Sequence, residues 1–257
     1  MKPWCPDRQQ PAFFRLLDGL FPQIQFIAAL SADARRGFPP ELLRQRLPIP
    51  QPQPRRPLPA VRRLPRETVL LIQIDGTLPN LALMKLSRHF KTQGRTVKLQ
   101  RGVRSLPAAD TVLASCVFNT PASHQRVAAL RRQYGPALQL GGSGVDLNLR
   151  LAPEVEALAS DYALYPELGD RAMGFLTRGC PFHCPFCVVP KKEGAPRQVA
   201  DFDALLQDRR KLILLDDNLL AHRDALPLLE EMLRRDLAVN FNQTLDLRLV
   251  TAAVAAL

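Results

Sequence analysis

The chain has 257 residues, 46% of them hydrophobic, which is enough for one large domain or two modest ones with a substantial core. It contains no apolar run that approaches a membrane span, and its start, MKPWCPDRQQ, lacks the layout of a secretory signal. Three of its five cysteines fall within one short loop, which argues against a disulfide scaffold and for a reducing, cytoplasmic setting.

The net charge of +11 is concentrated near the start of the chain. Residues 1–66 carry twelve Lys and Arg against four acids, and thirteen of the 24 prolines. Proline at this density removes backbone donors and blocks helix interiors, so residues 1–66 are predicted to be a largely disordered Pro/Arg-rich extension. Nucleic-acid binding through this basic segment is the alternative, and it is not favoured.

Residues 67–150 are predicted to form a doubly wound, Rossmann-like α/β unit. The run ETVLLIQIDG at 67–76 is typical of a buried parallel strand that ends in an Asp-Gly turn. A helix is expected over 78–94, ended by Gly94. Its inward-facing residues are expected to be Leu81, Met84 and Leu86. The alternation continues with strands at 96–100, 111–118 and 137–144 and a helix at 124–135.

A ligand of this first unit would lie beyond the carboxyl ends of its strands, near Asp75, Asn119 and Gly141–Gly144. The glycine run is interpreted as a tight turn after a strand rather than a phosphate cradle. Cys116 lies in an apolar strand and is interpreted as a small core residue.

A connector at 151–170 leads to a second α/β pattern at 171–257. A short strand at 171–179 runs straight into the loop GCPFHCPFC, at the end of the strand where such folds place their chemistry. Further strands are expected at 211–218 and 237–250, with helices at 201–210 and 222–236.

The loop holds Cys180, Cys184 and Cys187, and three thiolates held this close repel one another without a metal. Zinc is one interpretation, with His183 as a fourth ligand, but His183 adjoins Cys184 in a tight loop and no second Cys-x-x-Cys follows. An iron–sulfur cubane fits better, because each thiolate takes one iron and the fourth iron stays open to a substrate.

The Cys-x-x-x-Cys-x-x-Cys loop, with an aromatic residue before its last cysteine, resembles the radical SAM superfamily. The longer stretch GFLTRGCPFHCPFCVVPKKEG is similar to the branch with an N-terminal cobalamin-domain-like α/β unit. The segments IDGTLPNLALMKLS, GGSGVDL, DYALYP, LILLDDNLLA and FNQTLDLRLV are similar to that branch too. The resemblance covers roughly residues 67–257 and implies an α/β fold in which the Rossmann-like unit precedes a partial (β/α) radical SAM barrel.

The resemblance implies an enzyme in which Cys180, Cys184 and Cys187 ligate a 4Fe–4S cluster. S-adenosylmethionine would chelate the open iron, and the reduced cluster would cleave it to a 5′-deoxyadenosyl radical that acts on an unknown substrate. A reductase or a flavodoxin- or ferredoxin-type protein would donate the electron. The competing hypothesis is a non-enzymatic, zinc-binding, nucleic-acid-associated protein.

The same resemblance assigns roles to residues around the cluster loop. Phe186 would lie near the adenine of S-adenosylmethionine. The methionine ammonium would be contacted by the patch Asp216, Asp217 and Asn218, which stands where many members have Gly-Gly-Glu.

Two other polar groups each allow a pocket interpretation and a plain surface one. They are Lys191, Lys192 and Glu193 after the cysteines, and Asn242, Gln243, Asp246 and Arg248 after the third strand.

Two departures from the family pattern shape the expectations. The turn IDGTLPN has no cobalt-binding histidine, and His89 and His124 are interpreted as surface or boundary residues, so cobalamin would have to bind without the usual histidine ligand. Only about three strands follow residue 171, where the family's barrel has six β/α units. The chain therefore looks cut short, and efficient turnover is not expected of it.

Overall fold

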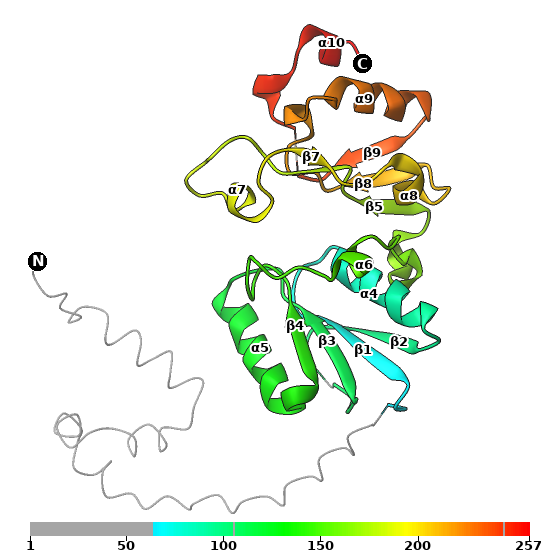
Figure 1. The fold of residues 1–257 in the computed structure, drawn as a ribbon, viewed down its shortest axis with the longest axis vertical. Helices are drawn as coiled ribbons and strands as arrows, with labels where there is room; N and C mark the ends of the chain where they lie inside the picture. The colour runs from blue at the N-terminus through cyan, green and yellow to red at the C-terminus, as the bar shows by residue number, and fades with distance from the viewer. Residues whose placement is uncertain (1–63, 105, 244) are drawn as a thin grey trace, which may run out of the picture. The chain divides into compact units, whose positions relative to one another are not determined.

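The computed structural model describes residues 64–104, 106–243 and 245–257, and these belong to one compact unit (Figure 1). The disordered extension predicted for residues 1–66 lies almost wholly outside the described residues and stays a prediction. The unit contains two parallel sheets joined by helices, so the predicted α/β class is confirmed. No helix in the described part of the chain has both the length and the apolar character needed to cross a membrane.

The first sheet has four parallel strands in the order β2-β1-β3-β4. They are β1 (Thr68–Gln73), β2 (Thr96–Arg101), β3 (Thr111–Ser115) and β4 (Leu138–Gly141). Every residue of β1 is buried, because the strand is central and helices cover both of its faces. The continuous apolar run that predicted a buried strand is explained by this position.

Helix α4 (Leu81–Thr92) begins where the side chain of Asn80 accepts a hydrogen bond from Leu83 N at 3.1 Å. Its buried residues are Leu83, Met84 and Ser87. The buried face of the helix is therefore slightly rotated from the predicted one. Met84 is buried as expected, whereas Leu81 and Leu86 are only partly buried at the border of the core. A short polar residue, Ser87, faces inward because its hydroxyl donates to Asp161 Oδ2 at 2.6 Å.

Helix α5 (Pro121–Tyr134) starts earlier than predicted, since Thr120 caps it and Pro121 occupies its first turn. Alternate residues of β1 face the two helices. Val69 and Leu71 share a core with residues of α4, whereas Leu70 and Ile72 share one with residues of α5. The helices thus cover opposite faces of the sheet, as a doubly wound unit requires (Figure 1).

The connector at 151–170 folds into three short helical segments: α6 (Pro153–Glu156), η3 (Tyr162–Leu164) and η4 (Pro166–Leu168). Two tyrosine hydroxyls tie it to both sheets. Tyr165 donates to Gln73 Oε1 at the end of β1 (2.9 Å), and Tyr162 donates to Leu205 O (2.7 Å) beside the second sheet. One core cluster runs from the α4 side of the first sheet into the second.

The second sheet has three parallel strands in the order β5-β8-β9. They are β5 (Arg171–Gly174), β8 (Lys211–Leu214) and β9 (Ala238–Phe241), and the connecting helices are α8 (Phe202–Leu206) and α9 (Ala225–Arg234). The remaining short elements are η2 (Gly135–Ala137), α7 (Val189–Lys192), η5 (Leu219–Ala221), η6 (Leu247–Leu249) and α10 (Ala252–Ala255).

The strand predicted at 171–179 is broken into two pieces. After β5 the backbone leaves the sheet, and Thr177–Arg178 pairs as β6 with Arg197–Gln198 (β7) in an antiparallel ladder. The break occurs because the backbone N–H groups of residues 176 and 177 donate to the carboxylate of Asp216, which follows the neighbouring strand β8, and not to a strand of the sheet. The β6–β7 pair closes the base of the cysteine loop.

Candidate functional site

The cysteine loop and the predicted acidic patch meet at one edge of the second sheet. β5 and β8 are parallel neighbours, with Gly174 opposite Leu214, so the segments that follow them leave the sheet at the same edge. The pairing extends one step further, since Leu215 N donates to Gly174 O at 2.8 Å. Strand β9 ends at this edge as well, and Asn242 N donates to Leu214 O.

Asp216 braces the chain that enters the cysteine loop. Its carboxylate accepts hydrogen bonds from Leu176 N (2.8 Å), Thr177 N (2.7 Å) and Thr177 Oγ1 (2.6 Å). Burial, together with the neighbouring carboxylate of Asp217, raises the pKa of Asp216 to about 6 despite these bonds. Both carboxylate oxygens of Asp216 therefore already accept hydrogen bonds from other residues of the chain.

Asp217 fixes the first residue of the loop itself. Its Oδ2 accepts from Gly179 N at 2.9 Å, and burial raises the pKa of Asp217 above its usual range. Gly179 has φ +96°, and a Cβ there would lie 2.4 Å from Ala195 O. Glycine is required at this position, because the returning end of the loop passes directly against its backbone.

Asn218 is the member of the patch that points at the cysteines. It is 6% exposed, and its Nδ2 lies 3.6 Å from Cys180 Sγ as a donor. Its Oδ1 is buried and has no hydrogen-bond partner among the described residues. A buried acceptor left unpaired costs roughly 1–3 kcal/mol, so a donor from a water molecule or from a ligand would stabilise this atom.

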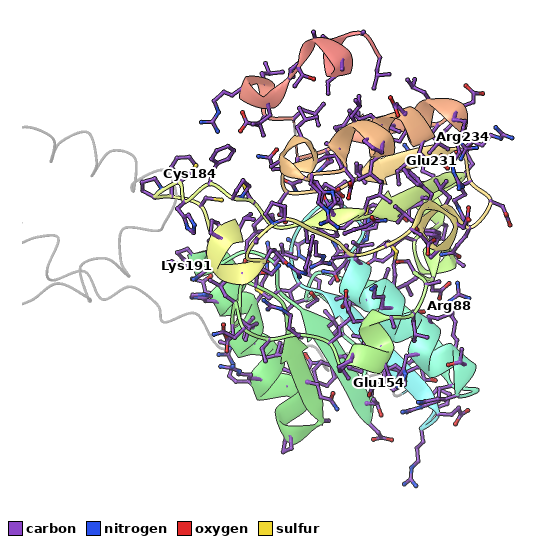
Figure 2. The ribbon with its side chains drawn as sticks, turned by 45° about the horizontal axis from the view of Figure 1, so that its top comes forward. Arg88, Glu154, Cys184, Lys191, Glu231 and Arg234 are labelled. Carbon is purple, nitrogen blue, oxygen red and sulfur yellow. The ribbon has the colours of Figure 1, made fainter. Side chains whose placement is uncertain are left out.

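Cys180, Cys184 and Cys187 are free, half-buried thiols on one loop, and a turn from Cys187 N to Cys184 O (3.0 Å) shapes its tip. Figure 2 shows Cys184 and Lys191 on the same projecting segment. In the described part of the chain, no three His, Cys, Asp or Glu side chains are already arranged to hold a metal ion. Phe186 is 89% exposed and contacts no core cluster.

The turn after β9 reaches the cysteine loop through Arg248. Its guanidinium lies 4.6 Å from the centroid of the Phe182 ring. The carboxylate of Asp246 accepts hydrogen bonds from Nε of Arg248 at 2.8 Å and from its Nη2 at 2.7 Å, and this pairing lowers the pKa of Asp246 to about 2. The pKa of Arg248 is raised, chiefly by Asp246 and to a smaller extent by the nearby thiols of Cys184 and Cys180.

The polar group after the cysteines divides into a buried part and an exposed part. The side chain of Glu193 is only 6% exposed, and it pairs with Arg178 (3.2 Å) and Lys192 (3.4 Å). Burial acts to raise its pKa, but these two cations hold it below the usual range. Glu193 therefore anchors the returning loop, while Lys191 on α7 is exposed to solvent.

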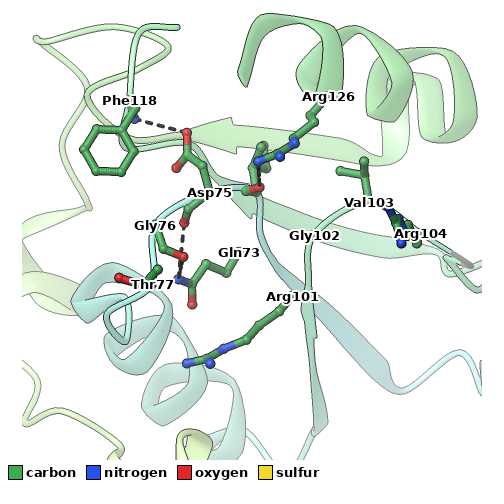
Figure 3. Close-up of a pocket in the computed structure, with 11 residues that line it drawn as sticks. Gln73, Asp75, Gly76, Thr77, Arg101, Gly102, Val103, Arg104, Phe118 and Arg126 are labelled. Atoms are coloured by element: carbon green, nitrogen blue, oxygen red, sulfur yellow. Dashed lines mark hydrogen bonds between the residues drawn. The ribbon is translucent and has the colours of Figure 1, made fainter. Parts of the chain in front are cut away.

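The carboxyl edge of the first sheet carries a cavity of about 820 Å³ (Figure 3). Asp75, named from the sequence, lines it, whereas Asn119 and the glycine run do not. Three arginines that were not predicted from the sequence also line it: Arg101, Arg104 and Arg126. Arg101 directly follows the expected strand at 96–100 and Arg104 lies in the turn after it, so their position at the end of a parallel strand was the signal that could have identified them.

The glycine run is a turn, as predicted. A Cβ at Gly142 would lie 2.2 Å from Cys116 O, so the run passes close to the end of β3. Cys116 itself is fully buried. Burial, with the Asp75 carboxylate nearby, raises the pKa of its thiol to about 11, which agrees with a core role rather than a reactive one.

No family model matches the sequence, and no curated protein matches it. Among solved structures, the chain is similar to the radical S-adenosylmethionine methyltransferase TsrM from Kitasatospora setae, solved with tryptophan substrate and the S-adenosylmethionine analogue aza-SAM. The two share 14% sequence identity with a TM-score of 0.45, over 66% of this chain and 51% of that one. The chain thus spans about half the length of that structure.

Proposed function

We propose that this chain is a radical SAM protein in which Cys180, Cys184 and Cys187 hold a 4Fe–4S cluster. The proposal is supported by three thiols on one loop that leaves the carboxyl end of a parallel strand. The observation that carries it is Asn218, a buried amide that donates toward Cys180 Sγ and whose Oδ1 has no hydrogen-bond partner in the part of the chain that the structure describes. In this proposal the thiolates that hold the cluster therefore lie beside an amide oxygen that accepts a hydrogen bond from the bound ligand.

Three cysteine thiolates are a suitable set of ligands for a 4Fe–4S cluster. Thiolates are the ligands of iron–sulfur clusters, and three on one short loop leave one iron of a 4Fe–4S cluster open. When bound, such a cluster supplies the electron that cleaves S-adenosylmethionine to a 5′-deoxyadenosyl radical. Metal binding is coupled to the ordering of its ligands, so the cysteines need to be able to approach one another rather than to be assembled beforehand.

In this proposal the chain's own residues position the cysteine loop and bind S-adenosylmethionine. Asp216 and Asp217 hold the start of the loop against the strand, through residues 176–177 and Gly179. Asn218 Oδ1 accepts a hydrogen bond from the ammonium of the methionine moiety. Phe186 offers an exposed ring to the adenine, and a flat base that covers it would remove apolar surface from water.

Asn218 is chosen within the patch because its Oδ1 is buried and has no hydrogen-bond partner among the described residues. Asp216 accepts three hydrogen bonds from the protein, and Asp217 accepts one from Gly179. We expect Asn218→Ala in the reconstituted protein to weaken S-adenosylmethionine binding by about tenfold, the typical effect of one hydrogen bond to a charged group. Affinity for 5′-deoxyadenosine, which has no ammonium, should not change; equal losses for both ligands would contradict the assignment.

The decisive experiment is anaerobic reconstitution followed by iron and sulfide analysis. Alanine replacement of any of the three loop cysteines should abolish the iron–sulfur absorbance, whereas Cys116→Ala should retain it, since that thiol lies in the core of the first sheet. A normal cluster in Cys184→Ala would contradict the proposal. So would stoichiometric zinc without sulfide, which is the result expected of the alternative zinc-binding protein.

Cobalamin with a histidine ligand does not fit the first sheet. The chain has four histidines, and none of them lines the cavity at its carboxyl edge. His89 bonds to Gln93 on α4, and His124 is exposed on α5. No step of the proposed chemistry is therefore assigned to cobalamin. The electron is proposed to come from a reductase or a flavodoxin- or ferredoxin-type partner.

A further inference from the structure

The cavity at the first sheet lies where its strand order reverses. From β1 the chain crosses to β2 by way of α4, and from β3 it crosses to β4 by way of α5 on the opposite face. In open α/β sheets this arrangement opens a crevice beyond the carboxyl ends of the central strands. Gly76 and Thr77 after β1 line the crevice, together with Gly102 after β2 and Phe118 after β3 (Figure 3).

The loops around the crevice are firmly held. Gln73 Nε2 donates to the carbonyl groups of Asp75 (3.2 Å), Gly76 (3.1 Å) and Leu78 (2.9 Å), which fixes the turn after β1. Gly102 N donates to Gln73 O at 2.8 Å and joins the turn after β2 to it. The cavity is therefore bordered by braced backbone.

Its charge is positive. Three arginines line it against one carboxylate, Asp75, whose oxygens are directed into the protein. They accept from Val117 N (2.7 Å), Phe118 N (3.1 Å) and Ser123 Oγ (2.7 Å). Burial acts to raise the pKa of Asp75, but these bonds hold it below its usual range, so the carboxylate is ionised and engaged.

The three arginines differ in whether their guanidinium groups already form hydrogen bonds or ion pairs. Arg101 pairs with Glu167, and Arg126 Nη1 donates to Ile74 O at 3.2 Å, which holds its guanidinium above the end of β1 (Figure 3). Arg104 is exposed, and its guanidinium has no hydrogen bond or ion pair with the described residues. At least one cation is thus free for an anion, beside a second that is already positioned.

An aromatic ring borders the same cavity. Phe118 is 52% exposed, and Val117 and Leu78 in the adjoining loops are each 40% exposed. A cationic wall together with an exposed ring suits a ligand that has both an anionic group and a flat apolar group.

We propose that this cavity binds a nucleotide-class ligand, with its phosphate at Arg104 and Arg126 and its heterocycle against Phe118. The site is separate from the cysteine loop, and the proposal does not depend on a cluster. Arginine matches phosphate through paired N–H donors, and the crevice at a strand-order reversal is where α/β sheets place such ligands.

The test is isothermal titration of the full chain with AMP as the probe. We expect saturable binding of AMP, and at least tenfold weaker binding both of adenosine, which lacks the phosphate, and of ribose 5-phosphate, which lacks the ring. The protein with all three loop cysteines changed to Ala should bind AMP like the wild type, which separates this site from the proposed adenosine-binding cluster site.

Variants then assign the contacts. Arg104→Ala should weaken AMP binding about tenfold without disturbing the fold, because its side chain is exposed. Phe118→Ala should weaken binding of AMP but not of ribose 5-phosphate. Arg132→Ala, an exposed change on the same helix as Arg126 and outside the cavity, is the matched control and should change nothing.

Three outcomes would overturn the proposal. They are equal affinity for adenosine and AMP, AMP binding unchanged in both Arg104→Ala and Arg126→Ala, and hydroxocobalamin binding at this cavity to a protein that does not bind AMP.

Discussion

Asp75 follows β1 and accepts hydrogen bonds from the amide groups of residues 117–118, which come after the neighbouring strand β3. Asp216 follows β8 and accepts them from residues 176–177, which come after the neighbouring strand β5. A hydroxyl completes each set, from Ser123 in one case and from Thr177 in the other. Both sheets thus use one aspartate to fix the loop that follows an adjacent strand.

The two edges differ in what lies beside that aspartate. Arginines and an exposed ring lie near Asp75. Asp216 is followed instead by a second carboxylate, Asp217, and by Asn218, whose Nδ2 lies near Cys180 and whose Oδ1 has no partner among the described residues. The pKa of Asp75 is lowered and that of Asp216 is raised to about 6, since Asp216 is more strongly desolvated and neighbours Asp217. The shared hydrogen-bond pattern holds the loops in place, and the two edges differ in the residues beside it.

The largest effect is expected from removing either aspartate. Asp75→Ala and Asp216→Ala each leave two backbone amides and one hydroxyl without an acceptor, so each should lower the free energy of unfolding by about 3 kcal/mol or more. Urea denaturation measures the loss. Hydrogen exchange should locate it at residues 117–118 for the first variant and at 176–177 for the second; the same pattern for both would show that the edges are not independent.

The pH dependence of stability should have opposite signs at the two edges. The folded-state pKa of Asp216, about 6, lies above its ordinary value of 3.8, so its contribution to stability is present below pH 4 and is lost as the pH rises through 6. A shift of this size corresponds to roughly 3 kcal/mol. Asp75 has a lowered pKa, so its contribution is present above pH 4 and is lost as the pH falls through its folded-state pKa.

Urea unfolding of the wild type and of Asp216→Asn between pH 4 and pH 7 checks this sign. The wild type should lose stability relative to the variant as the pH rises. A difference that stays constant, or that grows in favour of the wild type, would show that Asp216 titrates near its ordinary value.

A substitution at Gly179 should act on one edge alone. Gly179→Ala places a Cβ 2.4 Å from Ala195 O in a backbone with φ +96°, and we expect a cost of about 2 kcal/mol. The cysteine loop should become sensitive to protease and fail to take up iron, while AMP binding at the first sheet should not change. Gly194→Ala is the control for positive φ without the clash, because no described residue beyond its two chain neighbours has an atom within 4 Å of the added Cβ.

The smallest effect is expected at Arg248. It is paired with Asp246 and stacked on Phe182, so Arg248→Gln should leave the melting temperature almost unchanged. In the reconstituted protein, loss of a cation near the thiols should shift the midpoint potential of the cluster to a more negative value, because the reduced form carries more negative charge. Arg234→Gln, on the outer surface of α9, is the control; an equal shift there would contradict a local effect.

The alternation of strands and helices could be read from the sequence, because apolar runs and capping residues act locally. The run at 67–76 formed β1, the glycine run formed a turn, and Cys116 is buried in the core. The spacing of Cys180, Cys184 and Cys187 likewise singles out the loop from the sequence alone. The proposed cluster itself stays a prediction.

Only the tertiary structure separated Asn218 from Asp216 and Asp217, since which polar atoms are already hydrogen-bonded depends on the neighbouring strand. It also placed Arg248 beside Phe182, and it brought Arg104 and Arg126 from different elements to one cavity. Periodicity reports which side of an element is buried, but it contains no information on which distant side chains meet. That is decided by strand order and register, and these are set by packing across the whole core.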